Sequence, residues 1–141
     1  MKAYHGTQID PAEFDIDGTN ARGEFDTCFT TDDEAAAHYA EWDADEEEFV
    51  EGTIFHVDID ITDDEIAREE DVARVIGRDI DKTFWKVVDE YEVREAIRAA
   101  GYAAIAYDDD TTTRGMDHNC IRVIVPGRVE IVAVEEIEIP W

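Results

Sequence analysis

Three consecutive aspartates, Asp108 to Asp110, follow an apolar stretch in the last third of the 141-residue chain. A carboxylate held in such a place can stabilise positive charge that develops on a substrate, and this electrostatic effect is often the largest in catalysis. Adjacent carboxylates also repel each other, which favours protonation of one of them. A hard cation is a second use, but the spaced ligands and central glycine of a calcium loop are missing. In a chain with 38 acidic residues, a solvated loop is the plain alternative.

Two other parts of the chain combine histidine, hydroxyl and aromatic side chains. Tyr4-His5-Gly6-Thr7 stands near the N-terminus, and Phe29-Thr30-Thr31 is followed by His38-Tyr39-Ala40. Each has an ordinary structural explanation, because a histidine before glycine is often a turn residue and a helical tyrosine is more often core. Paired zinc-ligand spacing is absent among the histidines and cysteines, which include His5, Cys28, His38, His118 and Cys120. No metal site is predicted.

In this order, these residues resemble the ADP-ribosyltransferase superfamily. The resemblance continues in Gly101-Tyr102-Ala103-Ala104-Ile105, in the acidic loop, and in Val123-Ile124-Val125-Pro126-Gly127. These last segments are most similar to the small type I-F anti-CRISPR ADP-ribosyltransferases. The middle third of the chain has no such likeness. The resemblance implies an α+β fold of the ADP-ribosyltransferase type, with a mixed or antiparallel sheet, helices inserted mid-chain, and one domain over residues 1–141.

The resemblance also implies a site for NAD as co-substrate. His5 would bond a ribose hydroxyl, and the backbone of Gly6 would pair with the nicotinamide carboxamide, since a glycine permits close approach. Tyr39 would pack its ring against nicotinamide in an offset stack. Thr7 and Thr30 would complete the cofactor-binding set. The reaction breaks an N-glycosidic bond, so positive charge grows on the ribose as in oxocarbenium-like glycosidase transition states.

The catalytic carboxylate implied by the resemblance is Asp109. It stands seven residues after Tyr102, where the anti-CRISPR relatives carry their acid, and Asp108 and Asp110 are the alternatives. Most transferases of this fold use a glutamate at the start of a later strand, where this chain has Asn119-Cys120-Ile121. Either the acid has moved to the Asp108 to Asp110 loop, or the site is degraded and the fold serves another purpose. We favour the first.

The implied partner is a host protein, with a CRISPR effector complex as one candidate and a toxin target as another. The alternative from a different class is a non-catalytic acidic binding protein on the same scaffold, either a DNA mimic or a virion component. A phosphate-transferring RNA-processing relative ranks last because arginines are missing near His5. Direct nucleic-acid binding is not expected, since no basic aromatic patch is present.

The elements that must position these residues follow from local patterns. Alternation of Phe55, Val57 and Ile59 with polar residues predicts a half-buried strand over Thr53 to Ile61. The tetrads Thr31-Asp32-Asp33-Glu34 and Thr62-Asp63-Asp64-Glu65 have capping-box spacing and predict two helix starts. Further elements are predicted as strands at Lys2 to His5, Phe25 to Phe29 and Tyr102 to Tyr107, a helical region from Ile80 to Ala100 that stops at Gly101, a polar loop from Asp108 to Asn119, and a hairpin of Cys120 to Val125 with Val129 to Val134.

The composition describes a folding chain with an extreme charge. Hydrophobic residues make up 44%, while 38 acidic and 12 basic residues give a net charge of −26. This excess resembles halophilic archaeal or viral proteins, because self-repulsion nearly vanishes when the Debye length falls to about 3 Å in 1 M salt. Cys28 and Cys120, far apart and without a signal-like start, are expected to be reduced, which favours the cytoplasm, that of the host for a viral protein. No stretch long enough for a membrane span is expected.

Overall fold

The computed structural model describes residues 1–7, 27–32, 36–37, 40, 42–43, 48–49, 52–77, 84–109 and 118–136. One sheet has the order β1 (Lys2–Thr7), β5 (Thr53–Ile59), β9 (Val129–Glu136). A second sheet has the order β2 (Thr27–Phe29), β8 (His118–Val123), β7 (Ala104–Asp109), β6 (Ile66–Ala67). The remaining elements are the small pair β3 (Trp42–Asp43) and β4 (Glu48–Phe49), a 3-10 turn (Asp63–Glu65), and the helices α2 (Glu69–Ile76), α3 (Phe84–Val88) and α4 (Tyr91–Ala99). These elements confirm the expected α+β class.

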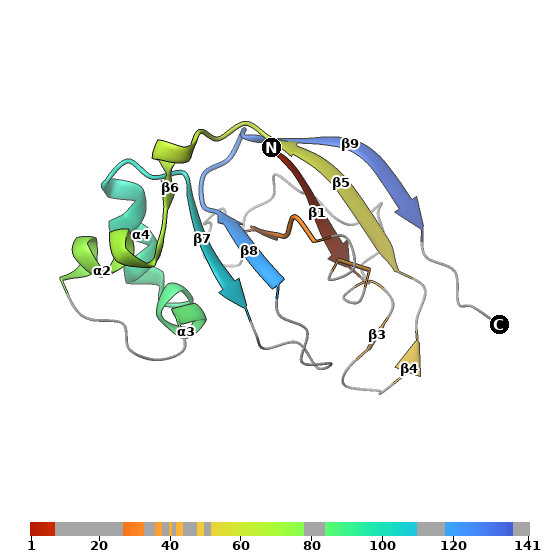
Figure 1. The fold of residues 1–141 in the computed structure, drawn as a ribbon, viewed down its shortest axis with the longest axis horizontal. Helices are drawn as coiled ribbons and strands as arrows, with labels where there is room; N and C mark the ends of the chain where they lie inside the picture. The colour runs from red at the N-terminus through yellow and green to blue at the C-terminus, as the bar shows by residue number, and fades with distance from the viewer. Residues whose placement is uncertain are drawn as a thin grey trace.

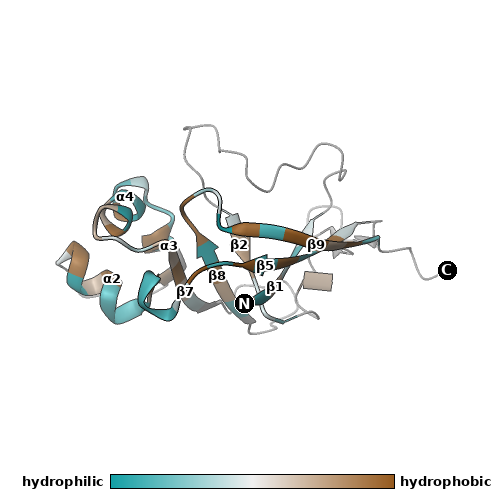
Figure 2. Cartoon of the chain, turned by 90° about the horizontal axis from the view of Figure 1, so that it is seen from above, coloured by the Kyte–Doolittle hydropathy of each residue, from teal (hydrophilic) through white to brown (hydrophobic). Residues whose placement is uncertain are grey.

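The described elements are arranged in layers (Figure 1). One hydrophobic cluster joins the β1-β5-β9 sheet to the β2-β8-β7-β6 sheet, and its members include Phe29, Phe55 and Ile121. A second cluster packs the opposite face of the β2-β8-β7-β6 sheet against the helices through Ile105, Val72 and Ile97, among others. The helices therefore lie at one end of the molecule, as the view from above shows (Figure 2). The junction between the sheets lies away from them.

The predicted strand over Thr53 to Ile61 is confirmed as β5. Phe55, Val57 and Ile59 are buried in the cluster between the sheets, whereas His56 and Asp58 point to the other face. The strand pairs antiparallel with β1 on one side and with β9 on the other. Alternation predicts this strand well because each face meets a different environment.

The predicted hairpin of Cys120 to Val125 with Val129 to Val134 is wrong. β8 pairs with β2 and β7, and β9 crosses to pair with β5 in the other sheet. Arg128 explains the change of direction, because its guanidinium donates to the carbonyl oxygen of Asp60 and binds the carboxylate of Glu65. The backbone N–H of Asp60 also donates to the carbonyl of Arg128 across 2.7 Å. These contacts direct the chain after Gly127 onto β5.

The second capping-box tetrad forms its hydrogen bonds but does not open the predicted helix. The backbone N–H of Thr62 donates to Glu65, and the tetrad closes as a single 3-10 turn. Ile66 and Ala67 then extend as β6, in parallel pairing with Ala104 and Ile105. Helix α2 starts later, after Arg68, whose N–H is capped by Asp71. Tertiary pairing with β7 thus overrides the local helix signal.

Other elements are close to their predicted positions. Helical structure between Ile80 and Ala100 is confirmed as α3 and α4, although residues 78–83 lie outside the described residues. Gly101 stands after α4 with φ of 97°, a left-handed conformation that glycine adopts readily. The first capping-box tetrad is described at Thr31 and Asp32 only, and helical backbone follows at residues 36, 37 and 40.

The expectation that Cys28 and Cys120 are reduced is wrong. The two residues form a disulfide between β2 and β8, with Cα atoms 6.2 Å apart. Cys28 lies opposite Arg122 in the register, so Cys120 is a diagonal neighbour within reach of its side chain. Sequence separation of 92 residues conceals this closeness, which the antiparallel pairing of β2 with β8 creates.

Candidate functional site

His5 lies where the two sheets meet. Its register partner in β5 is Phe55, so its side chain shares the face that forms the core between the sheets. The imidazole contacts Phe29 of β2 edge-on, with ring centroids 5.7 Å apart. This ring contact joins β1 to β2.

The hydrogen bond of His5 selects one tautomer. Its Nδ1 atom is 2.7 Å from the carbonyl oxygen of Cys28. Because a carbonyl only accepts, Nδ1–H is the donor, and Nε2 of the neutral ring is then an acceptor. Burial lowers the pKa of His5 below its ordinary value of 6.5, against the opposing effect of the Cys28 carbonyl. Near neutral pH the ring is uncharged, with an acceptor nitrogen suited to a hydroxyl group.

Thr30 links β1 to β8 and creates a row of polar residues across four strands. Backbone hydrogen bonds of 2.7 and 3.0 Å join Tyr4 and Thr30 in both directions. The Thr30 hydroxyl donates to Oδ1 of Asn119 across 2.9 Å. Asn119 is in turn the register partner of Asp108 in β7. Two of the predicted site residues, Thr30 and Asp108, thus belong to one row of paired strands.

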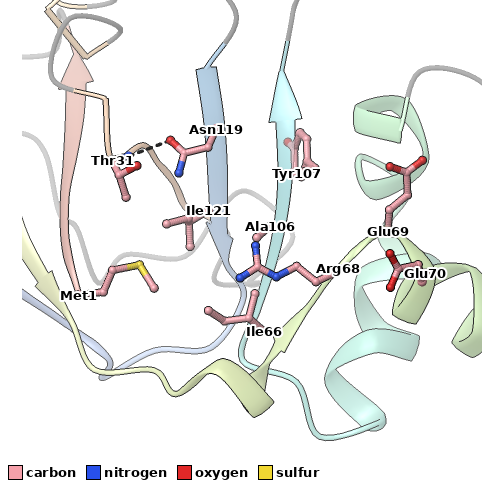
Figure 3. Close-up of a pocket in the computed structure, with 10 residues that line it drawn as sticks. All are labelled: Met1, Thr31, Ile66, Arg68, Glu69, Glu70, Ala106, Tyr107, Asn119 and Ile121. Carbon is pink, nitrogen blue, oxygen red and sulfur yellow. Dashed lines mark hydrogen bonds between the residues drawn. The ribbon is translucent and has the colours of Figure 1, made fainter.

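Asn119 has its amide orientation fixed by two donors. Its Oδ1 accepts from the Thr30 hydroxyl and from the backbone N–H of Thr31, the latter across 3.0 Å. The N–H of Asp32 donates to the same Thr30 hydroxyl, which completes that group. Both bonds use the oxygen of Asn119, as the dashed line to Thr31 in Figure 3 illustrates, and Nδ2 is the donor on the other branch of the amide. The residue thus presents a hydrogen-bond donor to its other side.

A pocket of about 530 Å³ opens beside this row (Figure 3). Apolar side chains of the sheet line it, and Thr31 and Asn119 stand at one side. The side chain of Arg68 extends across β7 toward β8. The volume lies in the range of small-molecule sites, roughly 300–1,000 Å³. The lining consists of Met1, Thr31, Ile66, Arg68, Glu69, Glu70, Ala106, Tyr107, Asn119 and Ile121.

The predicted close approach to Gly6 is made by the chain itself. A side chain at this position would overlap the backbone carbonyl of Ala36, so no ligand can approach from that face. The backbone N–H and C=O of Gly6 point along the sheet, not toward Ala36. Tyr4 bonds to Thr30 with both its N–H and its C=O, and strand alternation points those of Gly6 to the same edge. A pairing between Gly6 and a carboxamide must therefore come from this edge.

The predicted acids are placed by their backbone. Asp108 and Asp109 belong to β7, opposite Asn119 and His118, so the predicted loop from Asp108 to Asn119 is wrong at both ends. Cross-strand pairing extends both strands by about two residues, which the polar composition of this stretch conceals. Asp110 lies outside the described residues.

The predicted cofactor-binding residues are found in different surroundings. Thr7 is buried at the end of β1, on the face shared with His5, and Thr30 is buried within the row. Tyr39 lies outside the described residues. The pocket is lined by Thr31, the neighbour of Thr30, and not by His5, Gly6 or Thr7. The structure therefore brings the Thr30 segment to the pocket, and His5 is not among the lining residues.

Two residues of the site were missed by the sequence analysis. Asn119 was noted only as the absence of a glutamate, and its partners Thr30 and Thr31 are far from it along the chain. Arg68 gave no local signal, because it follows a capping tetrad that predicts a helix already in progress. One clue was available, since Arg68 is one of only 12 basic residues in the chain.

A comparison with protein-family models, curated proteins and solved structures finds no match for this chain. Across the described ranges, no three histidine, cysteine or acidic residues lie close enough together to bind a metal ion. The helices in the part of the chain that the structure describes are all too short or too polar to cross a membrane.

Proposed function

We propose that the chain is an ADP-ribosyltransferase that uses NAD as co-substrate and transfers ADP-ribose to a protein. The observation that carries the proposal is the row from Tyr4 through Thr30 and Asn119 to Asp108, with His5 next to Tyr4 in β1. It combines a neutral histidine, a hydroxyl group and a strand end rich in carboxylates at one junction of two sheets. This supports the ADP-ribosyltransferase type of α+β fold.

His5 has the protonation state that the proposed role requires. A ribose hydroxyl must donate to an acceptor, and Nε2 of the neutral ring is an acceptor because Nδ1–H is bonded to Cys28. Burial keeps the ring neutral by lowering its pKa. A protonated histidine would offer only donors and would place a positive charge beside a ribose that itself becomes positive in the reaction.

Gly6 provides a donor and an acceptor for nicotinamide. A carboxamide has a carbonyl that accepts and an NH₂ that donates, which complements the N–H and C=O of one extended residue. The peptide groups of Gly6 point to the same edge as those of Tyr4, two residues beyond the bridge to Thr30. Ala36 closes the opposite face of Gly6 and fixes the local backbone.

The proposed reaction breaks the bond between the ribose C1′ and the nicotinamide nitrogen. The electron pair of that bond leaves with nicotinamide, and the ribose carries positive charge until a nucleophile of the target bonds to C1′ and loses its proton. A carboxylate from Asp108, Asp109 or Asp110 stabilises this charge. Of these, Asp108 is the register partner of Asn119 in the paired strands β7 and β8.

The test is transfer of label from NAD carrying a labelled adenylate group to proteins of a lysate, in molar potassium chloride. We expect labelled protein with the wild-type chain, and a loss on the order of a hundredfold in at least one of Asp108→Asn, Asp109→Asn and Asp110→Asn. Asp63→Asn, in the exposed 3-10 turn, changes the charge by the same amount and serves as the control. Unchanged labelling by the triple variant would contradict the proposal.

A host protein is the proposed acceptor, as part of an anti-defence or toxin activity. The experiment above identifies it directly, since the labelled protein can be excised and sequenced. A CRISPR effector subunit among the labelled proteins supports the anti-defence role. Labelling of a translation or cytoskeletal protein supports the toxin role.

A second candidate function is a non-catalytic acidic binding protein, and Asn119 is the observation that favours it. An amide stands in the row where a carboxylate would be expected, and it is occupied by Thr30 and Thr31. A net charge of −26 suits mimicry of a nucleic acid. Mimicry weakens steeply as salt rises, whereas a nucleotide pocket persists, so binding measured across a salt series separates the two.

A further inference from the structure

Arg68 is the one described arginine whose guanidinium makes no hydrogen bond or ion pair with a described residue. In a chain with 38 acidic residues and 12 basic ones, a cation without a partner is unexpected. The other described arginines are all paired, through Asp71 and Tyr102 for Arg74, Val88 for Arg94, Glu95 and Ile124 for Arg98, Asp89 for Arg122, and Glu65 for Arg128.

The backbone of Arg68 is nevertheless fixed. Its N–H donates to Asp71 Oδ2 across 3.0 Å, at the start of α2. The side chain extends from this anchor into the pocket, across β7 (Figure 3). The ammonium group of Met1, the other cation of the lining, is already bonded to Asp58 and to the carbonyl of Ile59. Arg68 is therefore the positive group that the pocket offers to a ligand.

The rest of the pocket restricts the class of ligand. Nδ2 of Asn119 is a second donor, because its Oδ1 is bonded to Thr30 and Thr31. Glu69 and Glu70 also line the pocket, and their carboxylates are able to accept hydrogen bonds from hydroxyl groups, as acidic residues do from ribose in dinucleotide sites. Ile66 and Ile121 offer an apolar surface to a flat ring. A molecule that combines an anionic group, a sugar and a flat ring would match these three kinds of lining residue, and a nucleotide is such a molecule.

We infer that the Arg68 pocket binds the phosphate of a nucleotide, with the guanidinium as its bidentate partner and Asn119 as a further donor. The planar fork of an arginine matches two phosphate oxygens, and such charge-assisted bonds are stronger than neutral ones. The two glutamates disfavour free phosphate, so the sugar and ring are needed for binding. The inference rests on the proposed function for the identity of the nucleotide, which is then the adenylate half of NAD.

The experiment is calorimetric titration of the full chain in 1 M potassium chloride, with ADP as the probe. ADP lacks nicotinamide, so its binding does not depend on the proposed contacts of His5 and Gly6. We expect saturable binding of ADP, with adenosine and inorganic phosphate each at least tenfold weaker. Arg68→Ala should weaken ADP binding roughly ten- to a hundredfold, which is the usual effect of one lost charge-assisted bond. Arg68→Lys keeps the positive charge but not the planar guanidinium, so its affinity for ADP should lie between those of wild type and Arg68→Ala.

Arg74→Ala is the matched control. Arg74 lies on α2, the helix that begins directly after Arg68, and is absent from the pocket lining; its removal lowers the net charge by the same single unit. ADP affinity within about twofold of wild type is expected. Equal losses in Arg68→Ala and Arg74→Ala would mean that the effect is general electrostatics, and the inference would be wrong. Circular dichroism at the same salt concentration checks that each variant is folded.

Failure of the inference and failure of the proposed function give different results. If ADP binds through Arg68 but NAD is not cleaved and no ADP-ribose is transferred, the inference is supported and the proposed transferase function is rejected. If nicotinamide binds in a way that depends on His5 and ADP does not bind detectably, the inference about Arg68 is rejected and the proposed transferase function stands. Unchanged ADP affinity in Arg68→Ala also overturns the inference.

Discussion

The hydroxyl of Thr30 donates to the side-chain oxygen of Asn119 across 2.9 Å and so joins β2 to the start of β8. Thr30 is buried, and the backbone N–H of Thr31 shares the same acceptor. This relationship holds together the row on which the candidate site depends. Its removal should affect stability before it affects chemistry.

Asn119→Ala is expected to destabilise the fold by about 1–3 kcal/mol, because two donors lose their acceptor and one belongs to a buried side chain. Urea denaturation at constant salt measures the change in the free energy of unfolding. Asn119→Asp keeps an oxygen at the same place and should retain most of the stability at neutral pH. Equal stability of the alanine variant and wild type would contradict the structural role of Asn119.

The pKa of His5 predicts a specific dependence of stability on pH. The folded state holds this pKa below 6.5, so the unfolded chain binds the proton more readily. The stabilising contribution of the neutral ring is complete above pH 6.5 and is lost as the pH falls from 6.5 toward the lowered pKa of the folded state. The difference in unfolding free energy between wild type and His5→Gln, measured from pH 8 to pH 5, should decline only below about 6.5. A difference that instead grows as the pH falls would mean that the pKa is raised, and would contradict this account.

Glu65 and Arg128 predict a second pH dependence, at more acidic values. Two hydrogen bonds from the Arg128 guanidinium, of 2.7 and 3.2 Å, and further hydrogen bonds from Thr62 lower the pKa of Glu65 from 4.5 to about 2. The contribution of this pair is present above pH 4.5 and is lost as the pH falls toward 2. Glu65→Gln should remove this part of the acid transition in thermal unfolding. Because the pair directs the chain from β8 toward β9, the variant should also exchange the amide protons of β9 faster.

The disulfide predicts a clear effect of reductant. Closing a loop between residues 92 positions apart restricts the unfolded chain, and such a bond contributes on the order of 2–4 kcal/mol. Wild type in reductant, and the double variant Cys28→Ser with Cys120→Ser in any buffer, should unfold at a similarly lowered temperature. The double variant is the control, since reductant should leave it unchanged. Wild-type stability that is indifferent to reductant would show that the bond does not stabilise the fold.

Local sequence patterns correctly predicted those helices and strands whose residues alternate between buried and exposed positions or end at a characteristic residue. β5 alternates because its two faces differ, and α4 ends at Gly101 because the chain turns there in a left-handed conformation. The predictions that were wrong concern elements determined by contacts between residues far apart in the sequence. Ile66 and Ala67 form a strand only because β7 lies beside them, and β9 leaves β8 because Arg128 is bonded to Asp60 and Glu65.

For the candidate site, too, local features could be predicted from the sequence and long-range contacts could not. Histidine, glycine and hydroxyl residues at strand ends could be identified from the sequence as candidate ligand contacts. Their mutual geometry could not be predicted, because Thr30 and Asn119 are 89 residues apart in the chain and meet only through strand pairing. The partner of Cys28 and the position of Arg68 depend on the same pairings and on the packing of α2 against the sheet.

The central claim is that the chain binds NAD through His5, and calorimetric titration of NAD in molar potassium chloride tests it most directly. High salt screens the net charge of −26, so the measured affinity reports the site and not the repulsion of an anionic ligand. The account predicts saturable binding to wild type and a loss of at least tenfold in His5→Ala, with both proteins folded by circular dichroism. Absence of binding to the folded wild-type chain, or equal affinity in the variant, would contradict it.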